Sequence, residues 1–299
     1  MNIDGILLVN KPTSVSSSQV VIQIKKHFNL KKIGHSGTLD PLATGLLVMG
    51  VGEGTKLLDT LLNADKSYHT VAKLGVKTDT YDIDGQVIAT HSNIPTYHTK
   101  ELNALIQTYS GKQSQTPPTF SALKHQGKPL YHYARKGTPI SPKPREINIH
   151  ELTINQPSSD LLEMNVSCSK GTYIRSLVHD IGETLEVGAC IQSLKRTKLA
   201  HFNLEDAYNL EQLLAMKPES LGSSLEPLEK LFPNSSQFNL SNQEAKKLFY
   251  GQALDFVQTS PNPLLLYYHK SLVGVAHYTN SRWSITKRLS MQQLEEEII

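Results

Sequence analysis

The sequence predicts an α+β protein with one large and one small domain. Segments with strand and helix periodicity are mixed along the chain and separated by long stretches, whereas a doubly wound fold would alternate them regularly. The length of 299 residues is at the limit of what a single hydrophobic core serves, roughly 250 to 300 residues. Residues 233–236, with the turn-forming sequence PNSS, predict a boundary before a short β-rich end.

Three helices are predicted because apolar residues recur at helical spacing. The serines at 16–18 can cap the first helix, and Gly111 can terminate the second. The three apolar stripes are Val20, Val21, Ile24 and Phe28, ending near Asn29; Leu102, Leu105, Ile106 and Tyr109, within about residues 100–109; and Ile174, Leu177, Val178, Ile181 and Leu185.

Strands are predicted where apolar residues alternate. Residues 68–74 and 162–168 follow this pattern, and Asp84-Gly85 separates the first of them from the run Val87-Ile88, which predicts strand, turn and strand. Beyond the boundary, the short strand candidates are residues 263–268, 272–278 and 283–285.

The composition excludes several classes of protein. The chain has 38% hydrophobic and 19% charged residues, which is typical of a globular protein. Its formal charge of +3 is too small to indicate an obligatory polyanionic partner. The apolar run Ile6 to Val9 is too short for a signal peptide, and no stretch approaches the roughly 18 apolar residues of a membrane span. Cys168 and Cys190 lack a nearby metal-ligand cluster and are too few for a disulfide framework. A cytoplasmic protein without a metal is expected.

Positive charge is concentrated in one segment, residues 112–145. It holds seven Lys or Arg residues, six prolines and no Asp or Glu. Aromatic and histidine side chains lie between the cations, which combines phosphate-seeking charge with stacking surfaces and predicts contact with RNA. Poor periodicity indicates a long loop or arm. The alternative is a solvated insertion whose lysines only keep it soluble.

A glycine-rich motif, GHSGTLDPLATGLLVMGVGEGTK at residues 34–56, places Asp40 on a loop. Pro41 disfavours helix at the residue before it, so the carboxylate can face a ligand. The spacing matches neither a phosphate-binding loop nor a dinucleotide fingerprint. Taken alone, Asp40 is either a catalytic group or a turn residue that bonds its own backbone.

The sequence resembles the TruB family of tRNA pseudouridine synthases in seven blocks. They occur in the family's order over about the first 200 residues and are together highly specific. The blocks are NKP (10–12), HSGTLDPLATG (35–45), KSYHTVAKLG (66–75), TDTYDIDG (78–85), PPTFSALKHQGKPLYHYARKG (117–137), KGTYIRSLVHDIG (170–182) and LKRTKLAHF (194–202).

The resemblance implies a fold, a reaction and a substrate. The expected fold is a pseudouridine synthase domain over residues 1–232, with a central mixed or antiparallel sheet flanked by helices and an RNA-binding insertion at about 112–145. A β-rich, PUA-like RNA-binding domain is expected over residues 237–299, although this part of the sequence diverges from the family. The implied reaction converts uridine 55 in the T-loop of tRNA to pseudouridine, with no cofactor, no metal, no guide RNA and no protein partner.

The resemblance also assigns the catalytic residues. Asp40 matches the family's catalytic aspartate, which either attacks the sugar, as in retaining glycosidases, or removes a sugar proton to give a glycal-type intermediate. Arg175 matches the arginine that pairs with this aspartate and orients it. Tyr68 matches a tyrosine that stacks on the target base and is a candidate acceptor for the C5 proton.

Other residues are expected to hold the substrate or support the site. Leu194 matches a leucine beneath the base, Tyr173 supports Arg175, and His35 matches a residue that occupies space among displaced bases. Lys11 belongs to a motif that braces the active-site loop. The insertion is expected to close over RNA, and its contact residues are Lys124, Lys128, Tyr131 and Arg135.

Two other readings remain open on the sequence. One is an RNA-binding protein that refolds the T-loop of tRNA as a chaperone, with or without chemistry. The other is a guide-RNA-dependent relative of the same family, which would be expected to carry partner-binding extensions and a basic tail. The acidic run at residues 295–297 near the C-terminus does not fit that second reading.

Overall fold

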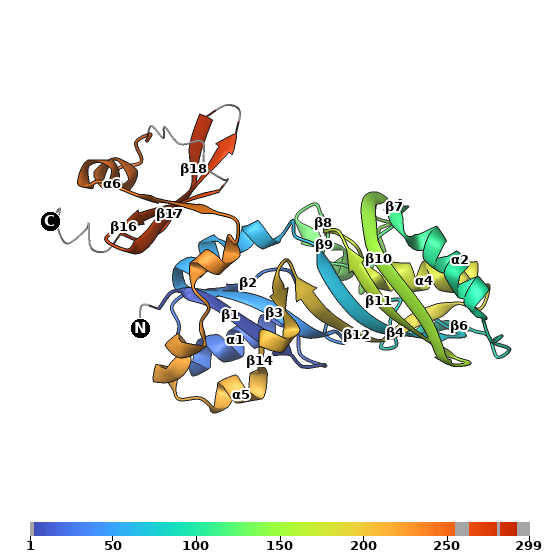
Figure 1. The fold of residues 1–299 in the computed structure, drawn as a ribbon. Coiled ribbons are helices and arrows are strands. Elements are labelled where there is room, and N and C mark those ends of the chain that lie inside the picture. The colour runs from blue at the N-terminus through green and yellow to red at the C-terminus, as the bar shows by residue number, and fades with distance from the viewer. Residues whose placement is uncertain (1–2, 255–262, 280–281, 292–299) are drawn as a thin grey trace.

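The computed structural model describes residues 3–254, 263–279 and 282–291. Within these ranges the chain forms a large part around one extensive sheet and a small part around a four-stranded sheet, which stands at the upper left in Figure 1. Helices and strands are mixed in both parts, so the α+β prediction is confirmed.

The large part is built on a ten-stranded mixed sheet. Its strands are β1 (Gly5–Lys11), β2 (Ile33–His35), β3 (Thr44–Val51), β4 (Lys66–Leu74), β7 (Gly111–Gln115), β10 (Arg145–Ser158), β11 (Leu161–Cys168), β12 (Ala189–Leu199), β13 (Phe202–Asn203) and β14 (Tyr208–Asn209). The main path runs β14-β1-β3-β12-β4-β11-β10-β7. The pairs β1–β14 and β3–β12 are parallel and the others are antiparallel, so the expected mixed sheet is present.

Two helices, α2 (Thr99–Tyr109) and α4 (Ile174–Thr184), pack with one face of the β12-β4-β11-β10 half of the sheet. The apolar stripe of α4 and the even-numbered residues of β11 are buried in one core. The alternating apolar residues of β11 and the apolar stripe of α4 therefore face the same core, as their sequence patterns predict.

The other half of the sheet, around β1 and β3, is packed by α1 (Ser17–His27) and α5 (Leu210–Ala215). Helix α1 begins with a capping box, in which Ser16 accepts from the backbone of Gln19 and the Gln19 side chain accepts from the backbone of Ser16. The side chains of Val20 and Ile24 are fully buried. This helix lies directly against the loop that carries Asp40.

Short elements complete the large part. They are the 3₁₀ turns η1 (Gly52–Lys56), η2 (Leu58–Leu61), η3 (Leu204–Asp206), η4 (Pro218–Ser224) and η5 (Leu228–Leu231), the strands β5 (Val76–Thr78), β6 (Val87–Thr90), β8 (Lys124–His125) and β9 (Lys128–Pro129), and helix α3 (Leu130–Ala134).

The strand-turn-strand prediction needs one correction. The run at Val87 pairs with β5 and not with β4, because the chain turns at Gly75, which has a φ of +76°. The hairpin that contains Asp84-Gly85 is therefore a separate two-stranded unit beyond the end of β4.

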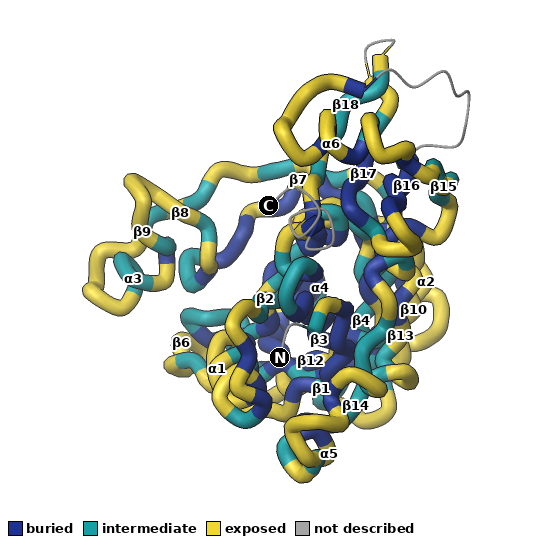
Figure 2. The backbone as a smooth tube through the Cα atoms, turned by 90° about the vertical axis from the view of Figure 1, so that its left-hand side faces the viewer, coloured by how far each residue is buried: buried dark blue, intermediate teal, exposed yellow. Residues whose placement is uncertain are grey.

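The basic segment is an arm whose two ends are anchored in the sheet. Its first residues belong to β7 and its last, Arg145, begins β10, and these two strands pair. Between them β8, β9 and α3 project from the body, as Figure 2 shows, and of their residues only Leu130 is buried. The predicted loop thus covers only the middle of the segment.

The small part contains β15 (Ser236–Asn239), β16 (Leu264–Tyr268), β17 (Ser271–Thr279), β18 (Arg282–Arg288) and α6 (Asn242–Phe249). The three predicted strands correspond to β16, β17 and β18. Leu265 and Val275 share a buried cluster with Ile6 of β1. The backbone of Ser290 also donates to Glu53 at 2.7 Å, so the two parts are in direct contact.

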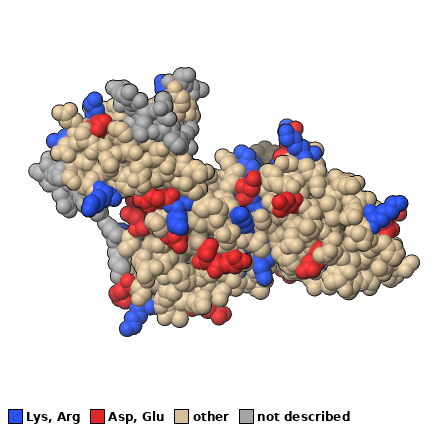
Figure 3. Space-filling view, viewed as in Figure 1, with Lys and Arg blue, Asp and Glu red and all other residues tan. Residues whose placement is uncertain are grey.

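Acidic and basic side chains are mixed on the face seen in Figure 3, which shows no extended patch of one sign. Among the described residues no helix is long and apolar enough to cross a membrane.

Candidate active site

A pocket of about 350 Å³ lies where the Asp40 loop, β4, the arm and the start of α4 meet. It is lined by Thr38, Leu39, Asp40, Ala43, Tyr68, Ala122, Leu123, Arg145, Gly171, Thr172, Tyr173, Ile174, Arg175 and Leu194. A larger cavity of about 600 Å³ between the two parts of the chain contains none of the predicted site residues. We take the smaller pocket as the candidate site because it brings together Asp40, Tyr68 and Arg175.

The Asp40 loop connects β2 to β3 and is held by the start of α1. The hydroxyl of Ser17 donates to the Leu39 carbonyl at 3.0 Å and accepts from the Leu39 amide at 2.9 Å. The Ala43 amide donates to the Asp40 carbonyl at 3.1 Å, which closes a turn around Pro41. The backbone of Asp40 is thereby fixed, and its side chain remains 41% exposed toward the pocket.

Lys11 braces the same loop from beneath. Its side chain is completely buried, and its Nζ donates to the backbone oxygens of Val15 at 2.5 Å and Pro41 at 3.2 Å. Burial lowers the pKa of Lys11 to about 8, and the nearby Asp40 carboxylate opposes this shift. Lys11 thereby ties the end of β1 to the turn at Pro41.

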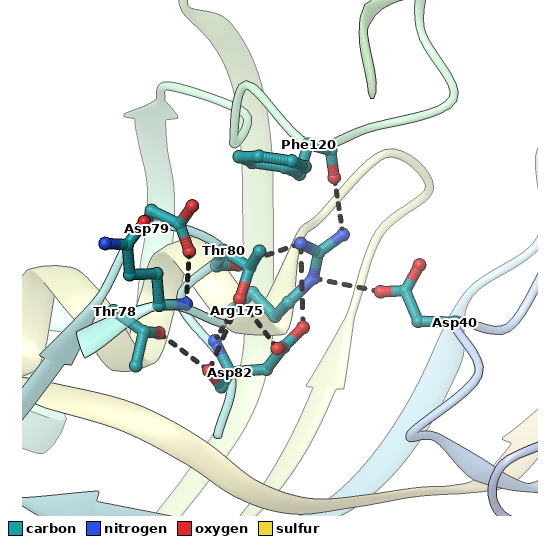
Figure 4. A network of polar contacts seen from close by, with 8 residues as sticks. Asp40, Thr78, Asp79, Thr80, Asp82, Phe120 and Arg175 are labelled. Carbon is teal, nitrogen blue, oxygen red and sulfur yellow. Dashed lines mark hydrogen bonds and ion pairs between the residues drawn. The ribbon is translucent and has the colours of Figure 1, made fainter. Parts of the chain in front are cut away.

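Arg175 stands in the first turn of α4, where β11 leads into the helix through Gly171 at a φ of +83°. Its Nε lies 2.9 Å from Oδ2 of Asp40 at ion-pair distance, although the N–H direction does not make this contact a hydrogen bond. Nη1 donates to the Thr80 carbonyl and Nη2 to the Phe120 carbonyl, both at 2.9 Å, as drawn in Figure 4. With 6% of its side chain exposed, Arg175 is nearly buried.

A second carboxylate stands on the other side of this guanidinium. Oδ2 of Asp82 lies 3.9 Å from Nη1 of Arg175, and Oδ1 of Asp82 accepts from the Thr80 hydroxyl at 2.7 Å (Figure 4). Burial raises the pKa of Asp82, while the Thr80 hydrogen bond and Arg175 oppose this shift. Arg175 is therefore placed between two carboxylates, of which only Asp40 lines the pocket.

Tyr68 and Leu194 come from the neighbouring strands β4 and β12 and both line the pocket. Their ring and isobutyl group give it an apolar surface able to receive a base. Burial raises the pKa of the Tyr68 hydroxyl, and the adjacent Arg196 guanidinium lowers it. The hydroxyl is therefore protonated at neutral pH in the free protein.

Arg196 is itself nearly inaccessible, with 1% of its surface exposed. Its Nε donates to the Leu46 carbonyl at 2.7 Å and its Nη2 to the Gly37 carbonyl at 3.1 Å. Gly45 permits this arrangement, because a Cβ there would lie 2.3 Å from the Arg196 carbonyl oxygen. A buried arginine thus links β3, the start of the Asp40 loop and Tyr68.

Five of the predicted site residues come together in the pocket: Asp40, Tyr68, Tyr173, Arg175 and Leu194. His35 does not line it. Its Nδ1 is buried without a hydrogen-bond partner, and burial lowers its pKa, with the Arg196 charge adding to the shift.

The four predicted contacts on the arm, Lys124, Lys128, Tyr131 and Arg135, do not line the pocket either. They lie on the projecting part of the arm, where the Arg135 guanidinium stacks 5.5 Å from the Tyr131 ring centre.

Three arginine or aspartate residues around the pocket were not predicted individually: Asp82, Arg145 and Arg196. Each lies inside or beside a segment that the sequence singled out, namely TDTYDIDG, the acid-free arm and LKRTKLAHF. What the sequence could not reveal is that their chain segments converge on Tyr68 and Arg175. Within the described ranges no three His, Cys, Asp or Glu side chains are grouped as a metal ion would require.

Comparison with known proteins places this site in a family. Residues 25–174 match the model of the TruB family pseudouridylate synthase N-terminal domain, and residues 175–232 match the model of the tRNA pseudouridylate synthase B C-terminal domain. A "tRNA pseudouridine synthase B" from Francisella tularensis subsp. holarctica is 41% identical over 83% of this chain and 82% of its own length. One of the same name from Legionella pneumophila is 43% identical over 85% and 83%.

Solved structures with the same fold include a Cbf5-Nop10-Gar1 complex, with a TM-score of 0.68, 23% identity and coverage of 94% of this chain and 82% of the other. An archaeal box H/ACA sRNP Nop10-Cbf5 complex follows, with a TM-score of 0.66, 21% identity and coverage of 95% and 85%. At these identities the likeness is one of fold. The family models and the curated relatives span both sides of the pocket, and the chain belongs to the TruB family of pseudouridylate synthases.

Proposed function

We propose that this protein converts uridine 55 in the T-loop of tRNA into pseudouridine, with Asp40 as the catalytic carboxylate. The observation that carries the proposal is the 2.9 Å approach of Arg175 Nε to Asp40 Oδ2 at a pocket that also contains Tyr68 and Leu194. The curated relatives support the substrate, because each is named tRNA pseudouridine synthase B.

The reaction is an isomerisation, so atoms and electrons balance within the nucleotide. The C1′–N1 bond breaks, the uracil turns, and a C1′–C5 bond forms; C5 then loses its proton and N1 gains one. Asp40 can attack C1′ or remove the C2′ proton, and both routes require an ionised carboxylate directed at the ribose. The guanidinium of Arg175 fixes the direction of the Asp40 carboxylate, because two backbone carbonyls anchor its planar fork.

Tyr68 and Leu194 hold the base while it is detached. The ring of Tyr68 gives the uracil a surface on which it can stack and turn, and Leu194 closes the apolar side of the pocket. The Tyr68 hydroxyl is the candidate acceptor for the C5 proton. It can accept that proton only as a phenolate, so Tyr68 must first give up its own proton, which can go to the N1 atom that gains one in the isomerisation. The neighbouring Arg196 charge would stabilise this phenolate until the C5 proton restores the hydroxyl.

The arm brings RNA to this pocket. Lys124, Lys128 and Arg135 supply exposed cations and Tyr131 a stacking ring, which suits a folded RNA whose target nucleotide must be extruded. The arm also reaches the pocket itself through Ala122 and Leu123. We assign His35 to the space left by displaced bases and Tyr173 to the support of Arg175.

The protein acts on tRNA directly, without a guide RNA or a protein partner. The names of the curated relatives refer to tRNA alone. The structural neighbours that were solved in complexes with other proteins are only 21–23% identical to this chain and share its fold. Residues 1–232 form the catalytic domain in this proposal, and residues 237–299 form a PUA-like domain that adds RNA contacts.

The test is incubation of the purified protein alone with an unmodified tRNA transcript, followed by mapping of pseudouridine. The proposal expects pseudouridine at position 55 and at no other uridine of the transcript. Lack of product with protein alone, and its appearance when a guide RNA or a second protein is added, would overturn the claim of direct action.

A further inference from the structure

The pocket contains an arginine that has no hydrogen-bond or ion-pair partner among the described residues. Arg145 lines the pocket together with Asp40 and Arg175, and its Nε is buried without a hydrogen-bond partner. Within the described residues its guanidinium makes neither a hydrogen bond nor an ion pair. A buried donor without an acceptor is unfavourable, so such a group in a functional pocket calls for an external ligand.

The guanidinium is nevertheless held in one place. Its Cζ lies 4.6 Å from the centre of the Tyr173 ring, over which it stacks. On another side is Gly171, where an added Cβ would lie only 3.4–3.5 Å from three atoms of the guanidinium. The backbone is fixed as well, because Arg145 pairs with Gln115 and Gln115 bonds both the amide and the carbonyl of Tyr173. Arg145 is thus a pre-positioned donor.

The two neighbouring arginines are different. Arg175 contacts Asp40 and two backbone carbonyls, and Arg196 donates to two carbonyls from within the core. Their donors are engaged by the protein itself. Arg145 alone of these three offers its charge and its planar fork to something outside the chain, which suits an anion with paired oxygens.

We propose that Arg145 binds a backbone phosphate directly beside the target uridine and so positions the everted ribose over Asp40. This inference rests on the proposed function, because a ribose at Asp40 carries its two flanking phosphates to the rim of the same pocket. A phosphodiester presents the paired oxygens that an arginine fork recognises. Arg145 is then a positioning residue, distinct from the exposed cations of the projecting arm.

The test measures whether Arg145 and one phosphate act as a pair. Three T-loop RNAs are compared: the natural one, and two with a neutral methylphosphonate at the phosphate 5′ or 3′ of the target. Each is titrated with wild type, Arg145→Gln and Lys143→Gln, where Lys143 is a neighbouring cation that does not line the pocket. Because Arg145 makes no hydrogen bond or ion pair with the described residues, Arg145→Gln loses only the stacking on Tyr173 and should melt within about 2 °C of wild type.

The expected result is coupling at one phosphate only. Arg145→Gln should bind natural RNA about tenfold more weakly, and one of the two methylphosphonates should weaken wild type by about the same factor. That methylphosphonate should not weaken RNA binding by Arg145→Gln any further. It should weaken RNA binding by Lys143→Gln as much as it weakens binding by wild type. The rate of a single turnover should fall with Arg145→Gln even at saturating RNA.

The inference would be overturned if both methylphosphonates still weakened RNA binding by Arg145→Gln. It would also be overturned if Arg145→Gln bound the natural RNA as tightly as wild type. Failure of the wild type to bind or modify the T-loop RNA would instead contradict the proposed function. The two failures are therefore distinguishable in one experiment.

Discussion

Arg175 connects the Asp40 carboxylate to the basic arm: its Nε lies 2.9 Å from Oδ2 of Asp40, and its Nη2 donates to the backbone oxygen of Phe120. Phe120 belongs to the segment whose cations we propose to contact RNA. A movement of the arm on binding RNA would therefore shift the nearly buried side chain of Arg175, and with it the Asp40 carboxylate.

Arg175→Lys should reduce kcat by at least about 100-fold, because one ammonium cannot contact Asp40 and both backbone oxygens at once, and a misplaced reacting group costs this much. The free energy of unfolding should fall by about 1–3 kcal/mol, since buried carbonyls lose their donors. Single-turnover kinetics and urea titrations measure the two effects. A rate within threefold of wild type would show that the fork does not orient Asp40.

Tyr68→Phe separates stacking from proton transfer. The ring is retained, so RNA affinity should stay within about threefold of wild type, while the hydroxyl beside Arg196 is lost and turnover should fall by at least about 100-fold. Tyr68→Leu serves as the comparison, because it removes the ring as well and should weaken both properties. Turnover of Tyr68→Phe at the wild-type rate would exclude the hydroxyl from the reaction.

Gly45→Ala should destabilise the protein by more than about 1 kcal/mol, because φ is +99° and the new Cβ would lie 2.3 Å from the Arg196 carbonyl oxygen. Gly111→Ala is a matched control, since φ is +82° there but nothing lies within 4 Å. Chemical denaturation measures both. If both variants lost the same free energy of unfolding, the close approach of β3 and β12 at Gly45 would not contribute to stability.

Asp180 should make stability depend on pH. Burial, aided by the Glu183 charge, raises the pKa of Asp180 from 3.8 to about 6. The folded state therefore holds this proton more tightly, and the stabilisation present below pH 4 is lost as pH rises to about 6.

Asp180→Asn should consequently be more stable than wild type at pH 7, by on the order of 1 kcal/mol given the partial exposure of the group. The difference should vanish near pH 4, where Asp180 is protonated in the folded protein. Thermal melts at pH 4, 5, 6 and 7 check this. A difference that is the same at every pH would show that Asp180 does not titrate abnormally.

The helices and strands that were predicted are those whose local patterns are clear, whereas β1, β3, β10 and β12 of the main sheet were not predicted. The stripe from Ile174 to Leu185 appears as α4, and the alternation at 162–168 appears as β11. The hairpin at Asp84-Gly85 was predicted with the wrong partner strand, since turn residues indicate where the chain reverses but not which strand it pairs with. That pairing depends on the left-handed conformation of Gly75.

The site was predicted only in part from its residues. Asp40, Tyr68 and Arg175 were assigned through resemblance to a family, and the structure brings all three to one pocket. The roles of Arg145 and Arg196 depend on burial and on the carbonyls or rings around each guanidinium, and no local pattern encodes these. An arginine that is satisfied by the protein and one that is free to bind a ligand look alike in sequence.

The most direct measurement of the central claim is tritium release from 5-labelled uridine in T-loop RNA by Asp40→Asn. Asparagine keeps the shape of the side chain but can neither attack the ribose nor accept its proton, so release should fall by at least about 1,000-fold while RNA affinity stays within about threefold. Asp206→Asn, at an exposed position outside the pocket, should behave as wild type. Release by Asp40→Asn at the wild-type rate would contradict the account.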